Sequence, residues 1–157
     1  MKTAWFLLLV GVAAVAYSGS ARAPQHTPHK QLIQAKGVPP SPAPFSPALL
    51  VGDTLYLSGS IGANPSTGQL VEGGFEPELR QIFANAQGLL AAAGMQLSDV
   101  VSVTVYLGDM KDYAQLNQVY REYFKAEPLP TRSTVAVKEL ARGAHLEITM
   151  TAVRANQ

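Results

Sequence analysis

Two stretches of this chain alternate apolar and polar side chains, and this alternation narrows the choice of folds more than any other feature. One stretch covers residues 98–107 and the other covers residues 145–153. A period of two is typical of β-strands that bury one face. The polar positions carry Ser, Thr, Tyr and Glu, so the second face of the predicted sheet must meet solvent or another subunit. The apolar positions are Val101, Val103, Val105 and Leu107 in the first stretch and Leu146, Ile148, Met150 and Ala152 in the second.

Two other stretches repeat their apolar residues with the spacing of an amphipathic helix. Residues 76–93 form the longer one, and Gly94 suits the position after its last turn. Residues 109–124 form the second, which either Asp109 or Asp112 can cap. The apolar faces comprise Leu79, Ile82, Phe83, Ala86, Leu89, Leu90 and Ala93 in the first helix and Tyr113, Leu116, Tyr120 and Phe124 in the second.

Shorter apolar segments supply the remaining strands. Gly52-Asp53 is a two-residue turn between residues 48–51 and residues 54–58, which predicts a β-hairpin. Residues 31–36 are a candidate first strand, and residues 133–137 are a further strand. The predicted order is strand, hairpin, helix, strand, helix, strand, strand. This order gives an α+β domain in which two helices cover one face of a single sheet.

The first 23 residues have the order of a secretory signal peptide. Lys2 is followed by an apolar stretch over residues 5–17 and by Ala21-Arg22-Ala23, which predicts cleavage after Ala23. The apolar stretch is short for a membrane span, which needs about 20 residues. We therefore expect a periplasmic or secreted protein. Contact with a membrane is expected only if this segment stays uncleaved as an anchor.

The expected organisation has three parts: a signal peptide at 1–23, a Pro-rich leader at 24–47 that includes the candidate first strand, and the remainder of the domain at 48–157. The full chain of 157 residues has a formal charge of +1. Cleavage would leave 134 residues with ten basic and eleven acidic side chains. Neither form has the broad positive surface that nucleic acids bind, so we expect no nucleic-acid partner.

The residues that the chain lacks exclude several kinds of site. The absence of cysteine rules out a disulfide framework, a thiolate metal site and a cysteine nucleophile. The sequence contains neither a Gly-rich nucleotide-binding motif nor the zinc-protease motif. Three dispersed histidines do not supply a set of metal ligands. We therefore expect neither a metal nor a cofactor.

Two charged residues in the predicted strands are candidates for chemistry. Arg132 begins a strand just after Pro128 and Pro130, where a rigid backbone would hold its guanidinium for bidentate capture of a carboxylate. The alternative for Arg132 is an ordinary surface salt bridge. Glu147 lies on the polar face of the last strand, where a carboxylate orients a water or moves a proton. The alternative for Glu147 is a solvated side chain.

Two polar residues are weaker candidates. Ser58 is followed by Gly59, and a glycine leaves room for a ligand near the backbone. A strand end that needs a turn explains the same pair. Asn117 interrupts the apolar pattern of the second predicted helix. The pattern leaves open whether it points inward to a partner or outward to solvent.

From about residue 31 to residue 154, the chain resembles the RidA (YjgF) family. The order and spacing of the matching segments carry the resemblance, since no single segment is specific. The matching segments are residues 55–61, 64–68, 85–94, 99–107, 109–113, 117–124, 130–133 and 146–148.

This resemblance implies a fold like that of the Bacillus chorismate mutase, with a six-stranded mixed sheet and two helices on one face. It also implies a homotrimer whose ligand pockets lie at the subunit interfaces. The implied activity is that of a 2-iminobutanoate/2-iminopropanoate deaminase. Such an enzyme hydrolyses reactive 2-imino acids, and enamines such as 2-aminoacrylate, to 2-oxo acids and ammonia without a cofactor or metal.

The resemblance also implies roles for individual residues. Arg132 matches the residue that binds the substrate carboxylate, and Glu147 matches the one that holds the attacking water. Ser58 matches a pocket serine that hydrogen-bonds the ligand, and Asn117 matches an asparagine near the pocket. The backbone around Thr134 matches a segment that helps to hold the water.

Two positions in the implied pocket depart from the family archetype. Phe45 stands where the archetype has a tyrosine, and Thr134 stands where it has a cysteine. Two other functions stay open besides deamination. One is a non-catalytic trimer that binds small carboxylate metabolites, which the lost tyrosine hydroxyl and the expected export favour. The other is a chaperone-like interaction protein, which the resemblance to a family with chaperone-like members implies.

Overall fold

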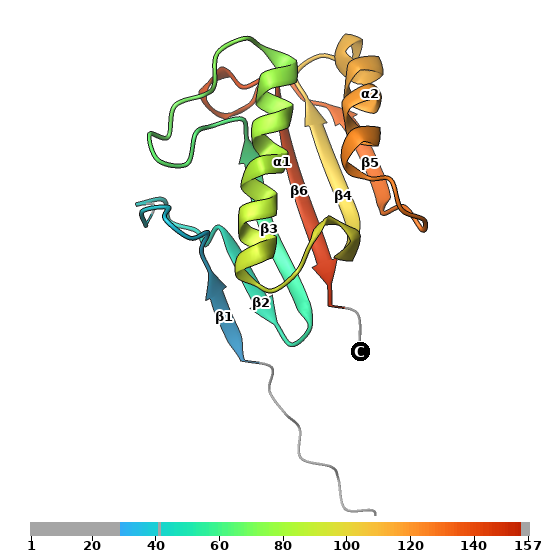
Figure 1. Ribbon diagram of the computed structural model, residues 1–157. Helices are drawn as coiled ribbons and strands as arrows, with labels where there is room; N and C mark the ends of the chain where they lie inside the picture. Colours follow the sequence, from blue (N-terminus) through green and yellow to red (C-terminus); the bar gives the residue numbers. More distant parts are fainter. Residues whose placement is uncertain (1–28, 41, 155–157) are drawn as a thin grey trace, which may run out of the picture.

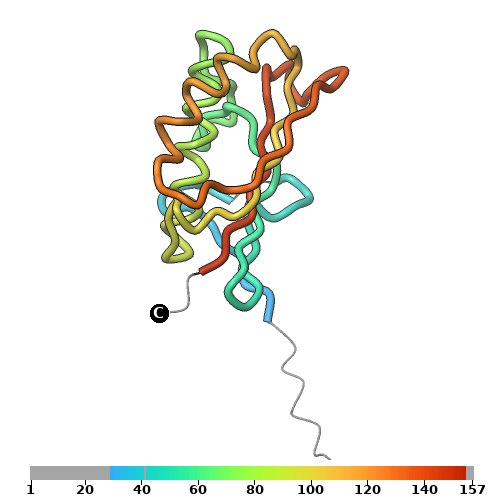
Figure 2. Tube along the Cα trace, turned by 90° about the vertical axis from the view of Figure 1, so that its right-hand side faces the viewer, coloured from blue at the N-terminus to red at the C-terminus, as the bar shows by residue number. Residues whose placement is uncertain are grey.

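The computed structural model describes residues 29–40 and 42–154, so the predicted signal peptide lies outside the described residues. One sheet carries two helices on one of its faces (Figure 1). A view turned by 90° separates the layer of helices from the layer of strands (Figure 2). The predicted α+β arrangement is therefore confirmed.

The sheet in the described part of the chain is six-stranded and mixed. Its order is β1-β2-β3-β6-β4-β5, which makes β1 and β5 the edge strands. β4 and β5 run parallel, and the other neighbouring pairs are antiparallel. The strands are β1 (Lys30–Ile33), β2 (Ala48–Val51), β3 (Thr54–Ile61), β4 (Val100–Leu107), β5 (Thr131–Ala136) and β6 (Leu146–Val153).

Both predicted helices are present, with ends close to the expected ones. α1 spans Phe75–Ala92 and α2 spans Tyr113–Tyr123. Gly94 has a φ of 70° just after α1, a conformation that glycine adopts readily and that ends a helix. Within the described ranges, no helix has the length and apolar character needed to cross a membrane.

A short 3₁₀ turn over Met110–Asp112 leads into α2. Asp109 caps this turn, because its carboxylate accepts a hydrogen bond from the Lys111 backbone N–H at 2.9 Å. Asp112 precedes α2 without a side-chain cap bond. Of the two predicted caps, Asp109 is therefore the one that is used.

The core lies between the sheet and the two helices. Phe83 of α1 stacks on Tyr123 of α2 with 4.2 Å between ring centroids, and Tyr120 stacks on Phe124 at 4.4 Å. These rings join the helices to each other above the sheet. The predicted alternation of β6 is confirmed, since its apolar positions are buried and its polar positions face away from the helices.

Two predicted apolar faces are wrong at one position each. Val101 is 45% exposed, whereas Val100 is buried. The pairing of β4 with β6 shifts between Val100 and Ser102, and a bulge of this kind inverts the alternation on one side of it. Tyr113 is 39% exposed, because it begins α2 at the edge of the core and its hydroxyl reaches toward Arg132 instead.

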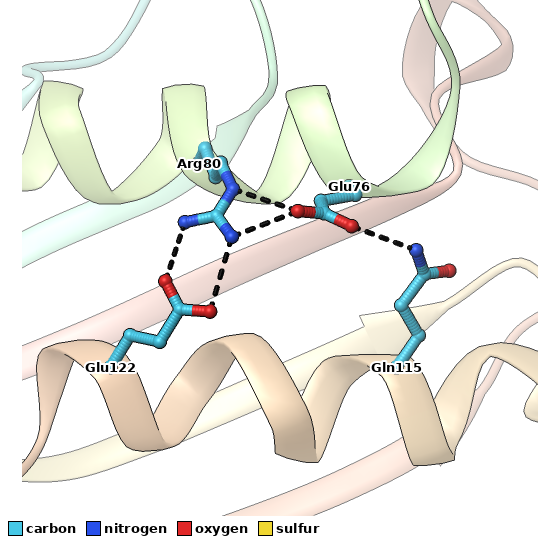
Figure 3. Close-up of polar contacts among 4 residues, drawn as sticks. All are labelled: Glu76, Arg80, Gln115 and Glu122. Carbon is cyan, nitrogen blue, oxygen red and sulfur yellow. Dashed lines mark hydrogen bonds and ion pairs between the residues drawn. The ribbon is translucent and has the colours of Figure 1, made fainter.

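An ion-pair network joins the helices on their outer surface (Figure 3). Nε and Nη2 of Arg80 both donate to Oε1 of Glu76, at 2.9 and 2.8 Å. Nη1 and Nη2 of Arg80 also donate to the Glu122 carboxylate on α2, at 2.8 and 3.2 Å. Gln115 completes the network with a bond to Glu76 at 3.2 Å. The hydrogen bonds from Arg80 lower the pKa of both carboxyl groups, so the network persists into mildly acidic solution.

Candidate active site

Arg132 is the second residue of the edge strand β5, and its side chain lies on the helix side of the sheet. Arg132 is paired in register with Val103 of β4. The Val103 side chain is buried under the helices, and paired residues on neighbouring strands point to the same face. Nη2 of Arg132 donates to Oδ1 of Asn117 at 2.6 Å and lies 3.5 Å from the Tyr113 hydroxyl. The guanidinium carbon is 4.6 Å from the centre of the Tyr120 ring. α2 therefore orients the cation through one amide and two rings, and Asn117 points inward.

The partners that orient Arg132 are all neutral. No carboxylate forms an ion pair with it within residues 29–40 and 42–154. The ordinary salt bridge considered as an alternative is thus not formed in this part of the chain. Burial raises the pKa of Tyr120 to about 12, so the phenol stays protonated beside the cation. A half-buried guanidinium with neutral neighbours is suited to bidentate binding of a carboxylate.

Two hydroxyls in this region are buried without a hydrogen-bond partner in the described structure. One belongs to Tyr120, which is 8% exposed. The other belongs to Thr134, which follows Arg132 by two residues and lies on the same side of β5. Buried polar groups are almost always paired, and each exception calls for an explanation such as a catalytic or binding role. These two hydroxyls mark the surroundings of Arg132 as a candidate binding site.

Glu147 lies on the opposite face of the sheet from Arg132. It is level with Tyr106 of β4 and Ile61 of β3, and the residues on either side of it are buried under the helices. Its carboxylate lies against Gly59, where an added Cβ would overlap Oε1. Gly59 therefore makes room for the Glu147 carboxylate. The glycine of the Ser58-Gly59 pair is therefore explained by this close approach. The alternative, a turn at the end of a strand, is a less specific explanation.

Ser58 fastens the Pro-rich segment to β3. Its hydroxyl donates to the carbonyl oxygen of Ser46 at 2.7 Å, and its N–H donates to that of Pro47 at 3.0 Å. Phe45, the residue before Ser46, is 62% exposed. The ring of Phe45 is therefore available to a ligand or to another chain.

The predicted site residues fall into two groups. The arginine group consists of Arg132, Asn117 and Thr134, from β5 and α2, and the glutamate group consists of Glu147, Ser58 and Phe45, from β6, β3 and the segment before β2. Arg132 and Glu147 lie on opposite faces of the sheet, and β4 separates their strands. One copy of the chain does not bring the two groups together. A site that uses both needs a second copy.

A buried carboxylate that the sequence reasoning did not single out lies just before the glutamate group. Glu78 of α1 is 2% exposed. One of its oxygens accepts the backbone N–H of His145 at 2.9 Å, and the other lies 2.8 Å from His145 Nδ1. This pair fixes the chain two residues before Glu147. A signal was present in the sequence, because Glu78 falls on the apolar face of its helix beside Leu79, where a carboxylate needs a partner.

Glu78 and His145 are two of the residue types that bind metal ions. A group of three or more His, Asp or Glu side chains placed to hold a metal ion does not occur in the part of the chain that the structure describes. The two contacts of Glu78 with His145 join α1 to the start of β6.

Comparisons with known proteins place the chain among others of similar sequence and fold. Residues 34–154 match the family model described as endoribonuclease L-PSP. A RutC family protein from Aquifex aeolicus is 42% identical over 123 residues, which are 78% of this chain and 98% of the relative. The human 2-iminobutanoate/2-iminopropanoate deaminase is 38% identical over 125 residues, or 80% of this chain and 90% of the relative. The crystal structure of a conserved Rid family protein from Yersinia pestis matches with a TM-score of 0.76 at 36% identity, covering 80% of this chain and 100% of that one.

Proposed function

This chain belongs to the endoribonuclease L-PSP family, to which the RidA (YjgF) proteins belong, and we propose that it hydrolyses reactive 2-imino acids to 2-oxo acids and ammonia. Relatives named 2-iminobutanoate/2-iminopropanoate deaminase, from human and from Dermatophagoides farinae, are 38% and 40% identical to it. One observation carries the proposal. Arg132 is oriented by neutral partners and has no carboxylate partner among the described residues. The carboxylate of an imino acid supplies the missing negative charge.

In the proposed reaction, Arg132 holds the substrate carboxylate and thereby sets the position of the C=N carbon. An enamine first takes up a proton at carbon and reacts as its imine tautomer. Glu147 orients a water, whose oxygen forms a bond to the imine carbon while the C=N electron pair moves to nitrogen. Glu147 accepts a proton from the water and passes it to the nitrogen. Glu147 then carries the hydroxyl proton of the adduct to the nitrogen, so that the C–N bond breaks, ammonia leaves and the C=O bond of the 2-oxo acid forms.

We further propose that the site is completed between copies of the chain in a homotrimer. One copy supplies the arginine group and its neighbour supplies the glutamate group. Support comes from the separation of Arg132 and Glu147 on opposite faces within one copy. The face away from the helices also exposes Tyr56, Val101 and Val135 by 52%, 45% and 46%. Apolar and aromatic side chains exposed on a sheet face suit a surface that another subunit covers.

Phe45 and Thr134 distinguish the proposed pocket from that of the family archetype. Phe45 contributes a ring without a hydroxyl, so it offers packing rather than a hydrogen bond. Thr134 contributes a hydroxyl beside Arg132 that is buried and unpartnered within the described structure. We assign both to the walls of the pocket, with Ser58 as a hydrogen-bond partner of the ligand and Asn117 as the residue that keeps Arg132 in place.

The proposal is tested by following the loss of an imine that an amino-acid oxidase produces in the same cuvette. Wild-type protein should accelerate this loss. The Arg132→Ala variant should lose at least about 100-fold in kcat/KM, because a hydrogen-bonded charge pair with the substrate is removed. Arg121→Ala removes an exposed arginine of α2 and should change nothing. Full activity of Arg132→Ala would show that the carboxylate is held elsewhere.

Further assays on the same purified protein distinguish between the other functions that the sequence left open. Calorimetric binding of a 2-oxo acid without any turnover of imine would favour a non-catalytic carboxylate binder. Suppression of the aggregation of an unfolded protein, with no small ligand bound, would favour a chaperone-like role. An RNA substrate serves as a further control, because the family description names an endoribonuclease.

We also propose that residues 1–23 direct export and are removed after Ala23. The order of Lys2, the apolar stretch over residues 5–17 and Ala21-Arg22-Ala23 supports this. Expression of the full chain with a C-terminal tag, followed by fractionation and mass measurement, should give a soluble exported product of residues 24–157. Recovery of the uncut chain in the membrane fraction would contradict cleavage.

A further inference from the structure

We propose that a cavity beside the glutamate group receives the side chain of the substrate, so that the enzyme prefers 2-imino acids with bulky apolar side chains. This inference rests on the proposed function and narrows it to a class of substrates. The cavity has a volume of about 350 Å³ and lies between α1, β3 and the segment before β2. Ser58, Gly59 and Phe45 line it together with Ala84, Gly88 and Leu89 of α1.

The walls of the cavity are mostly apolar, and two of their polar side chains are already paired. The Ser58 hydroxyl donates its hydrogen to the carbonyl oxygen of Ser46, so toward a ligand it acts only as an acceptor. The Asn85 amide donates to the carbonyl oxygen of Ala63 at 2.9 Å and accepts from Gln81 at 2.8 Å. Phe45 and apolar residues of the Pro-rich segment and α1 supply most of the remaining surface, and Gln34, Lys36 and Ser60 add polar groups. A ligand group without hydrogen-bonding atoms therefore fits this cavity best.

Small residues create the space. Gly88 on α1 lies close to Ala35, since a Cβ added at Gly88 would be 3.3 Å from the Ala35 Cβ. Ala84, one turn earlier on the same helix, also lines the cavity and is exposed to it. Larger side chains at these positions would occupy the volume. The helix face toward the Pro-rich segment is therefore open at the point where a substrate side chain can enter.

The cavity adjoins the place where the reaction is proposed to occur. Gly59 lines the cavity, and the Glu147 carboxylate occupies the position that a side chain at Gly59 would take. The α1 residues in its lining place the cavity on the helix side of β3, whereas Glu147 lies on the other face. β3 has no β2 partner beyond Leu57, so a substrate at this free edge extends from Glu147 into the cavity. The methyl or ethyl group of 2-iminopropanoate or 2-iminobutanoate would fill little of this volume. A side chain of the size found in leucine or phenylalanine would bury far more apolar surface.

The test compares imines produced in place from alanine, 2-aminobutyrate, leucine and phenylalanine. The wild-type kcat/KM should be at least about tenfold higher for the leucine or phenylalanine imine than for the alanine imine. Ala84→Phe fills the cavity from an exposed helix position, and it should lower kcat/KM for the leucine and phenylalanine imines far more than for the alanine imine, so that the preference disappears. Gln87→Phe adds the same ring at an exposed position outside the cavity and should change neither value.

The outcomes separate this inference from the function on which it rests. If no imine is hydrolysed, both are wrong. If all four imines are hydrolysed without preference for the bulky ones, or if Ala84→Phe lowers every kcat/KM equally, only the cavity assignment is wrong. Calorimetry adds a readout without turnover, because 4-methyl-2-oxopentanoate should bind more tightly than pyruvate to wild-type protein, and Ala84→Phe should remove the difference.

Discussion

At the scale of single residues, the Tyr120 hydroxyl is a group whose removal should stabilise the protein. It is buried and unpartnered within the described residues, while its ring packs on Phe124 and underlies Arg132. Tyr120→Phe keeps the ring and removes the polar atom. We expect the free energy of unfolding to rise by about 1 kcal/mol, since an unpaired buried polar group is costly. Denaturant titration measures this change, and a clear loss of stability would show that the hydroxyl has a partner.

The same variant should respond differently to alkaline pH. Burial raises the pKa of Tyr120 from 10.0 to about 12 in the folded protein. Between these values the unfolded chain loses the phenolic proton while the folded protein keeps it, so wild-type stability falls as the pH rises. The stability advantage of Tyr120→Phe should therefore widen from pH 10 to pH 12. A constant difference over this range would contradict the burial of the phenol.

Gly59 offers a test of where Glu147 must lie. The Glu147 carboxylate occupies the space that a Cβ at Gly59 would need. Gly59→Ala should displace the carboxylate from the water that it orients, and kcat should fall by about 100-fold. The variant should still fold, because residue 59 is exposed. Steady-state kinetics measures the change in kcat, and circular dichroism serves as the folding control. An unchanged kcat would show that Glu147 takes no part in the reaction.

At the scale of secondary-structure elements, periodicity alone predicted most of the fold. The helices and the β2–β3 hairpin lie where the pattern placed them, because each buries a regular apolar face. The bulge in β4 was not predictable, since Val100 and Val101 are equally apolar and only the pairing with β6 decides which one is buried. The expected first strand ends at Ile33 rather than at residue 36, because the chain leaves β2 there.

The link between α1 and β6 is the element-scale feature that the pattern did not reveal. Glu78 accepts the backbone N–H of His145 and contacts its ring nitrogen. Glu78→Ala leaves that N–H without its partner, and we expect the free energy of unfolding to fall by about 1–3 kcal/mol. Because His145 precedes Glu147 by two residues, kcat should fall as well. Glu139→Ala removes an exposed carboxylate and serves as the matched control. Equal effects of the two variants would contradict a stabilising contact between Glu78 and His145.

At the scale of the whole molecule, the sequence pattern predicted the strands that carry Arg132, Glu147 and Ser58. It did not predict how these residues lie relative to one another. A strand pattern fixes which face a side chain occupies only after the register is known. The register puts Arg132 under α2 and Glu147 on the other face. The family resemblance, rather than the spacing of residues, supplied the expectation that a second subunit takes part. The exposed apolar side chains on the face away from the helices agree with that expectation.

The central claim is that Arg132 of one copy and Glu147 of another act on the same imine, and co-expression of two inactive variants tests it most directly. Arg132→Ala and Glu147→Gln should each be inactive when expressed alone and should each elute as a trimer in size-exclusion chromatography. Random mixed trimers would contain sites with both groups intact, and their kcat should reach about a quarter of the wild-type value. Mixed trimers that stay as inactive as either variant alone would place both groups in a single copy and contradict the account.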